Sequence, residues 1–441
     1  MGTSAGGTDM SLENPGDLES PVLAIDPLLD DPKTRIIVCC GSGGVGKTTT
    51  AAALGVRAAE RGRKCVVLTI DPARRLAQSM GLSELDNTPR PVTDIDESAG
   101  GTLHAMMLDM KRTFDEVVLQ HADPERARAI LDNPFYQSLS AGFAGTQEYM
   151  AMEKLGQLRA LDAWNLIIVD TPPSRSALDF LDAPQRLGSF LDGKFIKLLM
   201  APAKVGGRAG MKFLNVGMSM MTGVLSKVMG AHLLGDVQTF IAAMDTMFGG
   251  FRKRADATYK LLQAPGTAFL VVAAPERDAL REAAYFVERL AAERMPLAGL
   301  VLNRVHGSGA PQLTAERALA AAQALEEPRE NLVDGGIVDR EAGKADSVAD
   351  GTDDGTDPKT PAEAADDMTI PPEQRLAAGL LRLHAERMRV VARERRTRDR
   401  FVSVHPEVPM VDVAALPGDV HDLDGLRSIG ERLAGDHPAA A

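Results

Sequence analysis

The chain has 441 residues, of which 44% are hydrophobic and 25% are charged, a composition typical of a globular protein with a sizeable buried core. Its formal net charge of −12 lies in two segments: residues 1–33 hold seven acidic residues and one lysine, and residues 334–367 hold eleven acidic and three basic residues. The rest of the chain is close to neutral, which argues against the broad basic surface that nucleic-acid-binding proteins carry.

The sequence predicts a protein of the cytoplasm. No uninterrupted apolar run reaches about 18 residues, the length that a membrane-spanning helix needs. The first residues are acidic and lack the apolar stretch of a secretory signal. The three cysteines, Cys39, Cys40 and Cys65, lie in strand-like apolar runs without C-x-x-C spacing, as expected for buried thiols in a reducing compartment. Transient association with membranes is left open.

Apolar runs of strand length recur along the chain and alternate with helical patterns. Most of them are continuously apolar, as expected for parallel strands that helices cover on both faces. This alternation predicts an α/β protein with a doubly wound, mostly parallel sheet. The runs are 35–40, 64–70, 102–108, 164–170, 267–274 and 297–305, with a last strand within 401–416 that Pro406 interrupts.

Two longer stretches between these runs, 109–163 and 184–263, read as helical and predict a helical subdomain inserted between strands. The second contains an apolar helix face rich in methionine, a side chain that suits grooves for varied apolar helices. The alternative, that this stripe packs on its own subdomain, carries equal weight. The residues of the stripe are Leu214, Met218, Met221, Leu225 and Val228.

Acidic, low-complexity sequence bounds the main folded region. Residues 1–33 are predicted to be a disordered segment and residues 334–370 a disordered linker. We expect the main domain over residues 34–333. Residues 371–435, which begin with a basic helix at about 371–400, add a helix and a strand that complete this domain.

The loop from Gly41 to Thr48 reads G-S-G-G-V-G-K-T and fits the pattern G-x-x-x-x-G-K-[ST]. It follows a strand-like run and precedes a helical pattern. The glycines let backbone N–H groups turn inward around a phosphate, and the helix N-terminus adds partial positive charge. In such a loop Lys47 contacts the β- and γ-phosphates, and the Thr48 hydroxyl lies on Mg²⁺. The predicted phosphate cradle is Gly43, Gly44, Val45, Gly46, Lys47 and Thr48.

Two aspartates follow strand-like runs. In "LTIDPARRL", Asp71 stands at the carboxyl end of a strand, where open α/β sheets place ligands. A carboxylate there could orient the attacking water in hydrolysis, and a helix N-cap role is the equally weighted alternative. In "LIIVDTPPS", Asp170 ends an apolar strand, the arrangement that holds Mg²⁺ in P-loop NTPases. The alternative for Asp170 is an aspartate that only ends a buried strand.

The motifs G-S-G-G-V-G-K-T-T, D-P-A-R-R-L and D-T-P-P-S, in this order and spacing, resemble the ArsA-type branch of deviant Walker A ATPases. That branch includes arsenite-pump ATPases and the Get-pathway ATPases that deliver tail-anchored membrane proteins. The resemblance covers residues 35–330 and resumes at 400–435. It implies a P-loop NTPase fold and a Mg²⁺-dependent ATPase. It also implies nucleotide-driven dimer switching that binds and releases a hydrophobic transmembrane-segment client.

The resemblance assigns roles to individual residues. It implies that Lys47, Thr48 and Thr49 bind phosphates and Mg²⁺, that Asp71 is the water-orienting aspartate of switch I, and that Asp170 is the aspartate of switch II. The segment "GTQEYMAMEKL" resembles the helix that precedes the second switch.

The same carry-over identifies an adenine site. Asn303, in "LVLNRV", matches the asparagine that contacts adenine in the family. Leu416 and Pro417, in "AALPGDV", match the late loop that packs on adenine. The implied cofactors are ATP and Mg²⁺. Neither an arsenite site nor the zinc-binding C-x-x-C pair of eukaryotic relatives is expected, because the chain lacks the cysteines for them.

Ser42 departs from the family pattern. In the family, lysine at this position reaches across a nucleotide-sandwiched dimer to the partner's phosphates, and it supplies charge as an arginine finger does. Serine leaves nucleotide binding intact but loses that charge. Two explanations follow: the chain pairs with a homologous subunit that retains the lysine, which we favour, or it is a slow homodimeric ATPase.

Two other functions compete with membrane-protein targeting. A positioning ATPase of the MinD or ParA kind shares the P-loop and switches, but the final residues "GDHPAAA" are not a basic membrane-binding helix, and the near-neutral core does not favour DNA. The other alternative is a regulatory subunit that binds nucleotide without binding a client.

Overall fold

The structure, a computed structural model, divides into two compact units. The first contains the described residues of 20–305 and 395–435, and the second contains those of 306–394. The structure describes residues 20–70, 75–139, 146–172, 253–327 and 370–435, with the single residues 240 and 250.

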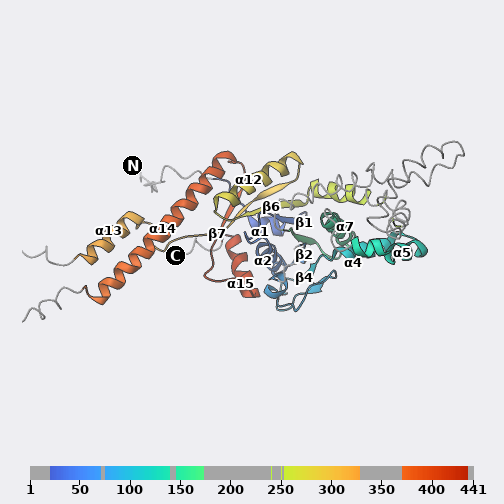
Figure 1. Ribbon diagram of the computed structural model, residues 1–441, viewed down its shortest axis with the longest axis horizontal. Coiled ribbons are helices and arrows are strands. Elements are labelled where there is room, and N and C mark those ends of the chain that lie inside the picture. The colour runs from blue at the N-terminus through green and yellow to red at the C-terminus, as the bar shows by residue number, and fades with distance from the viewer. Residues whose placement is uncertain are drawn as a thin grey trace, which may run out of the picture. The chain divides into compact units, whose positions relative to one another are not determined.

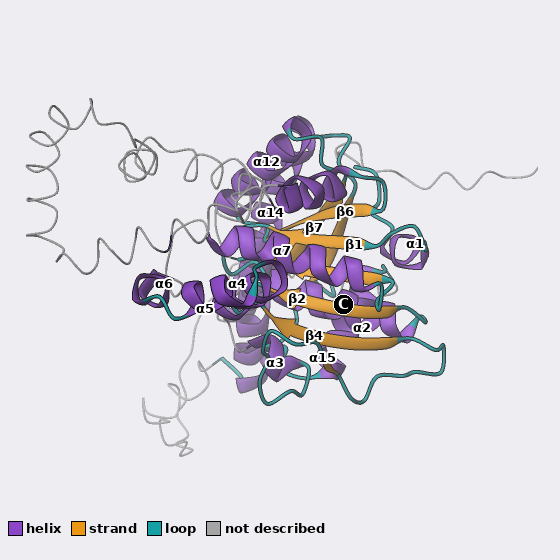
Figure 2. Cartoon of the chain, turned by 90° about the vertical axis from the view of Figure 1, so that its right-hand side faces the viewer, coloured by secondary structure: helices purple, strands orange, loops and turns teal. Residues whose placement is uncertain are grey.

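One sheet forms the centre of the first unit (Figure 2). It has eight strands, in the order β3-β4-β2-β5-β1-β6-β7-β8. Every neighbouring pair is parallel except β3 and β4, which are antiparallel. This confirms the predicted α/β fold with a mostly parallel sheet. The strands are β1 (Ile36–Cys40), β2 (Lys64–Thr69), β3 (Arg90–Pro91), β4 (Thr102–Met107), β5 (Leu166–Asp170), β6 (Thr267–Ala273), β7 (Leu297–Val305) and β8 (Met410–Ala414).

Helices cover both faces of the sheet (Figure 1). On one face α4, α7 and α12 pack against the sheet, and on the other α1, α2 and α15 do so. The helices are α1 (Ile25–Asp30), α2 (Lys47–Glu60), α3 (Arg75–Ser79), α4 (Met110–His121), α5 (Pro124–Leu131), α6 (Pro134–Leu139), α7 (Thr146–Leu161), α12 (Arg277–Ala292), α13 (Ala315–Glu326), α14 (Pro372–Val404) and α15 (Leu423–Leu433).

The strands are continuous apolar runs in the sequence because helices pack on both faces of the sheet. Successive side chains of a strand point to opposite faces, and in β1 Ile36 and Val38 join one core while Ile37 and Cys39 join the other. Each face therefore needs an apolar side chain at every second position, and the whole strand is buried.

The prediction of disorder over residues 1–33 is wrong for residues 20–33. Helix α1 buries Ile25 and Leu29, one turn apart, against the sheet side that carries α2. The one acidic residue between them, Asp26, accepts two hydrogen bonds from Arg57 of α2, at 2.6 and 2.7 Å. The sequence shows the acidic charge of this segment but not the arginines that lie opposite it.

The last predicted strand, 401–416, is also partly wrong. Residues 401–404 are the end of α14, where Phe401 and Val402 are buried, and only Met410–Ala414 is a strand. Pro406 stands two residues beyond the helix, a common place for proline after a helix end. The basic helix predicted at 371–400 is present but extends to Val404.

The helices predicted within 109–163 are present as α4 to α7, between β4 and β5. Most of the second predicted insertion, 184–263, lies outside the described residues, and so does the methionine-rich stripe within it. Residues 1–19 and most of the predicted linker at 334–370 lie outside them too. Residues 253–263 are helical. Within the described part of the chain, no helix is both long and apolar enough to cross a membrane.

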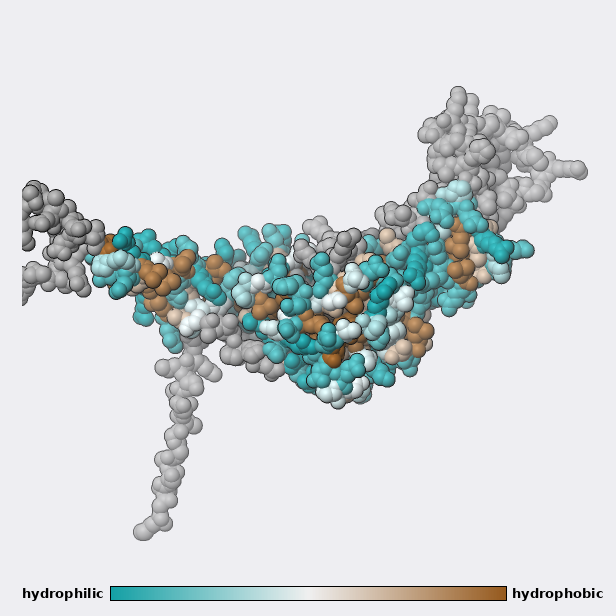
Figure 3. All heavy atoms as spheres, turned by 90° about the horizontal axis from the view of Figure 1, so that it is seen from below, coloured by the Kyte–Doolittle hydropathy of each residue, from teal (hydrophilic) through white to brown (hydrophobic). Residues whose placement is uncertain are grey.

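The second unit consists of residues 306–327, which include α13, and the first two thirds of α14. Residues 306–327 were predicted to lie in the main domain and instead belong to this second unit. Its apolar core is small and contains Ala318 and Ala385. Apolar side chains also gather on the surface of this unit, at the left of Figure 3. The exposed leucines of α14 are Leu376, Leu380 and Leu383.

Candidate functional site

The glycine-rich loop joins the carboxyl end of β1 to the N-terminus of α2, at the edge of the sheet where α/β proteins bind ligands. Two of its glycines are required by their surroundings. A Cβ atom on Gly46 would lie 2.2 Å from Nδ2 of Asn303, and one on Gly41 would lie 2.1 Å from the carbonyl oxygen of Val272. Gly46 also has a φ of 97°, in the left-handed region that favours glycine.

Lys47 is the first residue of α2 and is buried, with 5% of its surface exposed. Its Nζ donates a hydrogen bond of 2.7 Å to the carbonyl oxygen of Ser42, across the mouth of the loop. A buried ammonium group needs several acceptors. The loop thus holds a positive charge at the point where a phosphate would lie.

Thr48 and Asp170 meet in the structure, although 122 positions separate them in the sequence. Thr48 Oγ1 donates a 2.8 Å hydrogen bond to Asp170 Oδ2, and Thr69 Oγ1 donates a second, of 2.9 Å, to the same oxygen. The parallel pairing of β5 with β1 produces this contact, because it sets Asp170 opposite Cys39, two residues before the loop begins at Gly41. A buried carboxylate beside a threonine hydroxyl is a set of hard oxygen donors, which fits Mg²⁺.

Asn303 is buried at the carboxyl half of β7 and faces the loop. Its Nδ2 donates a 2.8 Å hydrogen bond to the carbonyl oxygen of Val45, so its amide holds the loop backbone. Leu416 is half-buried and Pro417 is exposed, two and three residues beyond the final residue of β8, the neighbour of β7. The three predicted adenine contacts therefore lie at the carboxyl ends of adjacent strands.

Residues 34–327 match the sequence model of a family described as anion-transporting ATPase. This match covers two thirds of the chain. The chain belongs to this family. Its membership confirms the predicted ArsA/Get resemblance and the prediction of an ATPase.

Individual relatives of the anion-transporting ATPase agree with the family assignment. The chain is similar to "ATPase GET3" of Malassezia globosa, 28% identical over 171 residues that span 39% of this chain and 48% of the relative. It is 25% identical to "ATPase GET3" of Podospora anserina over 300 residues, 66% of this chain and 80% of the relative. It is 26% identical to "ATPase ARSA2" of Chlamydomonas reinhardtii over 294 residues, 66% of this chain and 72% of the relative. The aligned region thus spans from under half to four fifths of the length of these relatives.

In this ATPase the residue predicted to orient water, Asp71, lies outside the described residues. Its neighbour Ile70 is fixed, because its carbonyl oxygen accepts a 3.0 Å hydrogen bond from Nε2 of Gln147 in α7. Neither Gln147 nor Thr69 was predicted to be a site residue. Thr69 is a small polar residue inside an apolar strand, and nothing in the pattern separates such a threonine from an ordinary core position.

The cysteines of this ATPase are buried in β1 and β2 and free of disulfides. Burial raises the pKa of Cys40 and of Cys65 to about 12, so both thiols are protonated at neutral pH. Burial first, and then the charge of Asp170, raises the pKa of Cys39.

Proposed function

We propose that the chain binds ATP with Mg²⁺ at the loop between β1 and α2 and hydrolyses it. We further propose that nucleotide-driven dimer switching binds and releases a hydrophobic client, in the targeting of membrane proteins. The observation that carries the nucleotide site is the hydrogen bond between Thr48 and Asp170, because it joins the start of α2, after the loop that follows β1, to the end of the adjacent strand β5.

The proposed mechanism assigns each residue a task. The N–H groups of Gly43 to Thr49 surround the phosphates, and Lys47 exchanges its bond to the Ser42 carbonyl for phosphate oxygens. Thr48 and Asp170 hold Mg²⁺, which, when bound, neutralises charge on the β- and γ-phosphates. Asp71 orients the attacking water.

The adenine end of the nucleotide is proposed to lie beyond the loop. Asn303 positions the base there, with Leu416 and Pro417 packing on it. The support is their location at the carboxyl ends of β7 and β8. The hydrogen bond from Asn303 to Val45 adds a link between the base site and the loop.

The proposed partner is a homologous ATPase subunit. The relatives named ATPase GET3 and the family resemblance support a dimer, and Ser42 favours a heterodimer in which the other subunit supplies the missing charge. The proposed client is a transmembrane segment, held by helix-in-groove contacts on the inserted helical subdomain.

The test of the nucleotide site is Lys47→Ala, measured by titration with a fluorescent ATP analogue. We expect affinity to fall by about a hundredfold, since the buried cation would be lost from the phosphates. The matched control is Lys64→Ala, which removes an exposed lysine at the start of β2 and should leave affinity unchanged. Equal affinity of Lys47→Ala and the control would contradict the proposal. ATP binding without turnover, in the chain alone and with its partner, would favour the regulatory subunit.

A further inference from the structure

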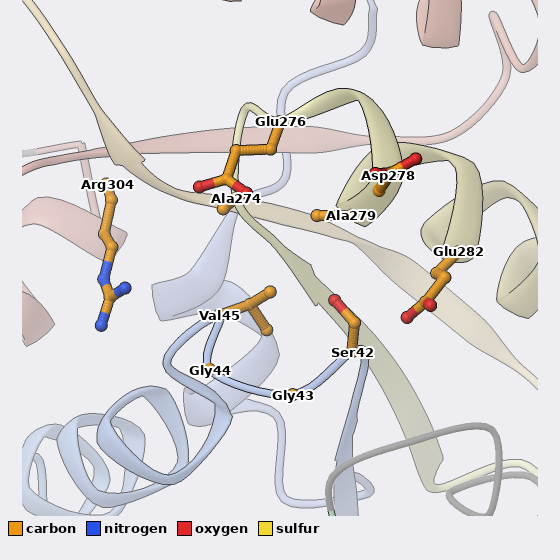
Figure 4. A pocket seen from close by; sticks show the side chains of 10 residues that line it. All are labelled: Ser42, Gly43, Gly44, Val45, Ala274, Glu276, Asp278, Ala279, Glu282 and Arg304. Atoms are coloured by element: carbon orange, nitrogen blue, oxygen red, sulfur yellow. The ribbon is translucent and has the colours of Figure 1, made fainter.

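A cavity of about 320 Å³ lies beside the glycine-rich loop (Figure 4). Its walls are Ser42–Val45, the first turns of α12 with the residues before them, and Arg304 at the carboxyl end of β7. The carboxylates on the α12 side are Glu276, Asp278 and Glu282. Figure 4 shows the Arg304 guanidinium on the side away from Asp278 and Glu282. The basic side of the cavity therefore belongs to the residue that follows Asn303, the predicted adenine contact.

The backbone of Arg304 is left-handed, with a φ of 63°, a conformation that is costly for a residue with a side chain. Three other described non-glycine residues share it, and none of them lies in a strand. Asp162 and Arg294 follow the ends of α7 and α12, where left-handed residues are common, and Asp94 lies in a loop. Arg304 lies inside β7, so a helix end does not explain its conformation.

This conformation belongs to a β-bulge. Asn303 and Val305 pair with successive residues of β8, so Arg304 is the extra residue between them. Bulges re-aim side chains and are common beside functional sites. At this bulge the N–H group of Arg304 donates a 3.0 Å hydrogen bond to Oδ1 of Asn303, and Nδ2 of Asn303 donates to the Val45 carbonyl oxygen. The bulge therefore fixes the Asn303 amide and sets the direction in which the Arg304 side chain leaves the strand.

The guanidinium of Arg304 is available for a ligand. Arg304 is exposed, and its side chain forms no hydrogen bond or ion pair with any residue that the structure describes. Backbone strain of this kind persists mainly at functional sites, where it prepares a contact that the folded protein alone does not use. A guanidinium group is flat and weakly hydrated, and it stacks on the faces of aromatic rings. A nucleotide base offers such a face.

We propose that Arg304 is a further nucleotide-binding residue, whose guanidinium stacks on the adenine base of bound ATP. This rests on the base site proposed above and adds a cationic face to the apolar contacts proposed for Leu416 and Pro417. The base is favoured over the phosphates as the group that Arg304 contacts. The phosphates already have the buried cation of Lys47, whereas Arg304 follows Asn303 directly in β7.

The test is calorimetric titration of the full chain, in the presence of Mg²⁺, with two probes. One is a non-hydrolysable ATP analogue, and the other is inorganic tripolyphosphate, which lacks the base and the ribose. We expect Arg304→Ala to lower the affinity for the ATP analogue by about two- to fivefold, as for an exposed cation–π contact, and to leave the affinity for tripolyphosphate unchanged. Arg304→Lys should lose most of the same affinity, because an ammonium group keeps the charge but not the plane.

Arg294→Ala is the matched control. It removes another exposed arginine with a left-handed backbone, which lies before the amino end of β7 and does not line the cavity. The affinities of Arg294→Ala for both probes should equal those of the unsubstituted protein.

Arg304→Gly separates the role of the side chain from that of the backbone. Glycine adopts the left-handed conformation without strain, so the Tm of Arg304→Gly should lie about 2–4 °C above that of Arg304→Ala. Both variants keep the backbone N–H group that donates to Asn303. Their affinities for the ATP analogue should therefore fall equally, because both lack the guanidinium.

Three results would overturn the inference: equal affinity of Arg304→Ala and Arg294→Ala for the ATP analogue, an equal loss of affinity for both probes in Arg304→Ala, or full affinity of Arg304→Lys for the ATP analogue. The second result would assign the guanidinium to the phosphates. The unsubstituted protein tests the proposed function in the same titrations. Binding of neither probe would contradict the proposed ATP site, whereas binding of both probes together with any of the three results would contradict only this inference.

Discussion

Replacing Arg63 with methionine is expected to destabilise the first unit strongly. The buried guanidinium of Arg63, just before β2, donates to four backbone carbonyls from two segments of the chain. Leu29 is in α1, Asp31 and Thr34 lie between α1 and β1, and Asn165 immediately precedes β5. One side chain thus ties the N-terminal segment to two central strands.

The magnitude follows from these contacts. A hydrogen bond from a charged donor contributes about 1.5–3 kcal/mol, and four carbonyls would lose theirs together. The sum is an upper bound, because burial lowers the pKa of Arg63 and so shows that the charged form already bears a desolvation penalty, which methionine would recover. We therefore expect a loss of about 3–5 kcal/mol in the free energy of unfolding.

The assay is thermal unfolding followed by tryptophan fluorescence. The chain has a single tryptophan, Trp164, and it adjoins Asn165, so its signal reports the region that Arg63 holds. A loss of this size lowers Tm by about 10 °C in a domain of this length. The Tm of Arg63→Lys should lie between those of Arg63→Met and the unsubstituted protein, because an ammonium group cannot reach all four carbonyls. The control is Arg281→Met, whose side chain is 73% exposed. A Tm for Arg63→Met within about 2 °C of the control would refute the reasoning.

Two further predictions concern the loop and the N-terminal helix. Gly46→Ala should lower ATP affinity at least about tenfold, because the new Cβ would clash with Asn303. Gly435 also has a left-handed backbone but lies in open space, so Gly435→Ala should leave ATP affinity unchanged. Equal ATP affinities of the two variants would contradict this prediction. Hydrogen bonds from Arg57 lower the pKa of Asp26 in the folded protein. These bonds therefore stabilise the folded state fully above the pKa that Asp26 has in the unfolded chain, about 3.8, and the stabilisation is lost as pH falls through the lower pKa of the folded state. In urea unfolding, Asp26→Asn should lower the free energy of unfolding by about 1 kcal/mol at neutral pH, and this loss should shrink as pH falls below the unfolded pKa; a loss independent of pH would argue against it.

The sheet could be predicted from the sequence because its strands are buried on both faces, which makes them continuous apolar runs. The six main runs lie within two residues of the observed strands. The elements that were missed or misassigned depend on distant partners. Helix α1 is short and acidic, and it is stabilised by Arg57 of α2 and by burial of Ile25 and Leu29. Phe401 is helical because its side chain packs in the core, although its neighbours read as a strand.

The candidate site could be predicted where one motif carries the chemistry, as in the loop that contains Lys47 and Thr48. It could not be predicted where the chemistry depends on register or on facing loops. Nothing in the sequence shows that Thr69 shares an oxygen of Asp170 with Thr48, because this follows from the alignment of β2, β5 and β1. The carboxylate of Glu282 stands 240 positions from Ser42, and only the fold brings them to one cavity.

The residues that precede β1 determine where a fragment of this protein must start if it is to fold. Backbone hydrogen bonds join Leu23 and Pro21 to Met410, at 2.9 and 2.8 Å, so the first described residues continue the sheet beyond β8. The match to the family begins only at residue 34. A fragment trimmed to that motif boundary would leave the buried face of α2 and the edge at Met410 open to water, and it would tend to aggregate. Fragments for biophysical work should therefore start before Pro21.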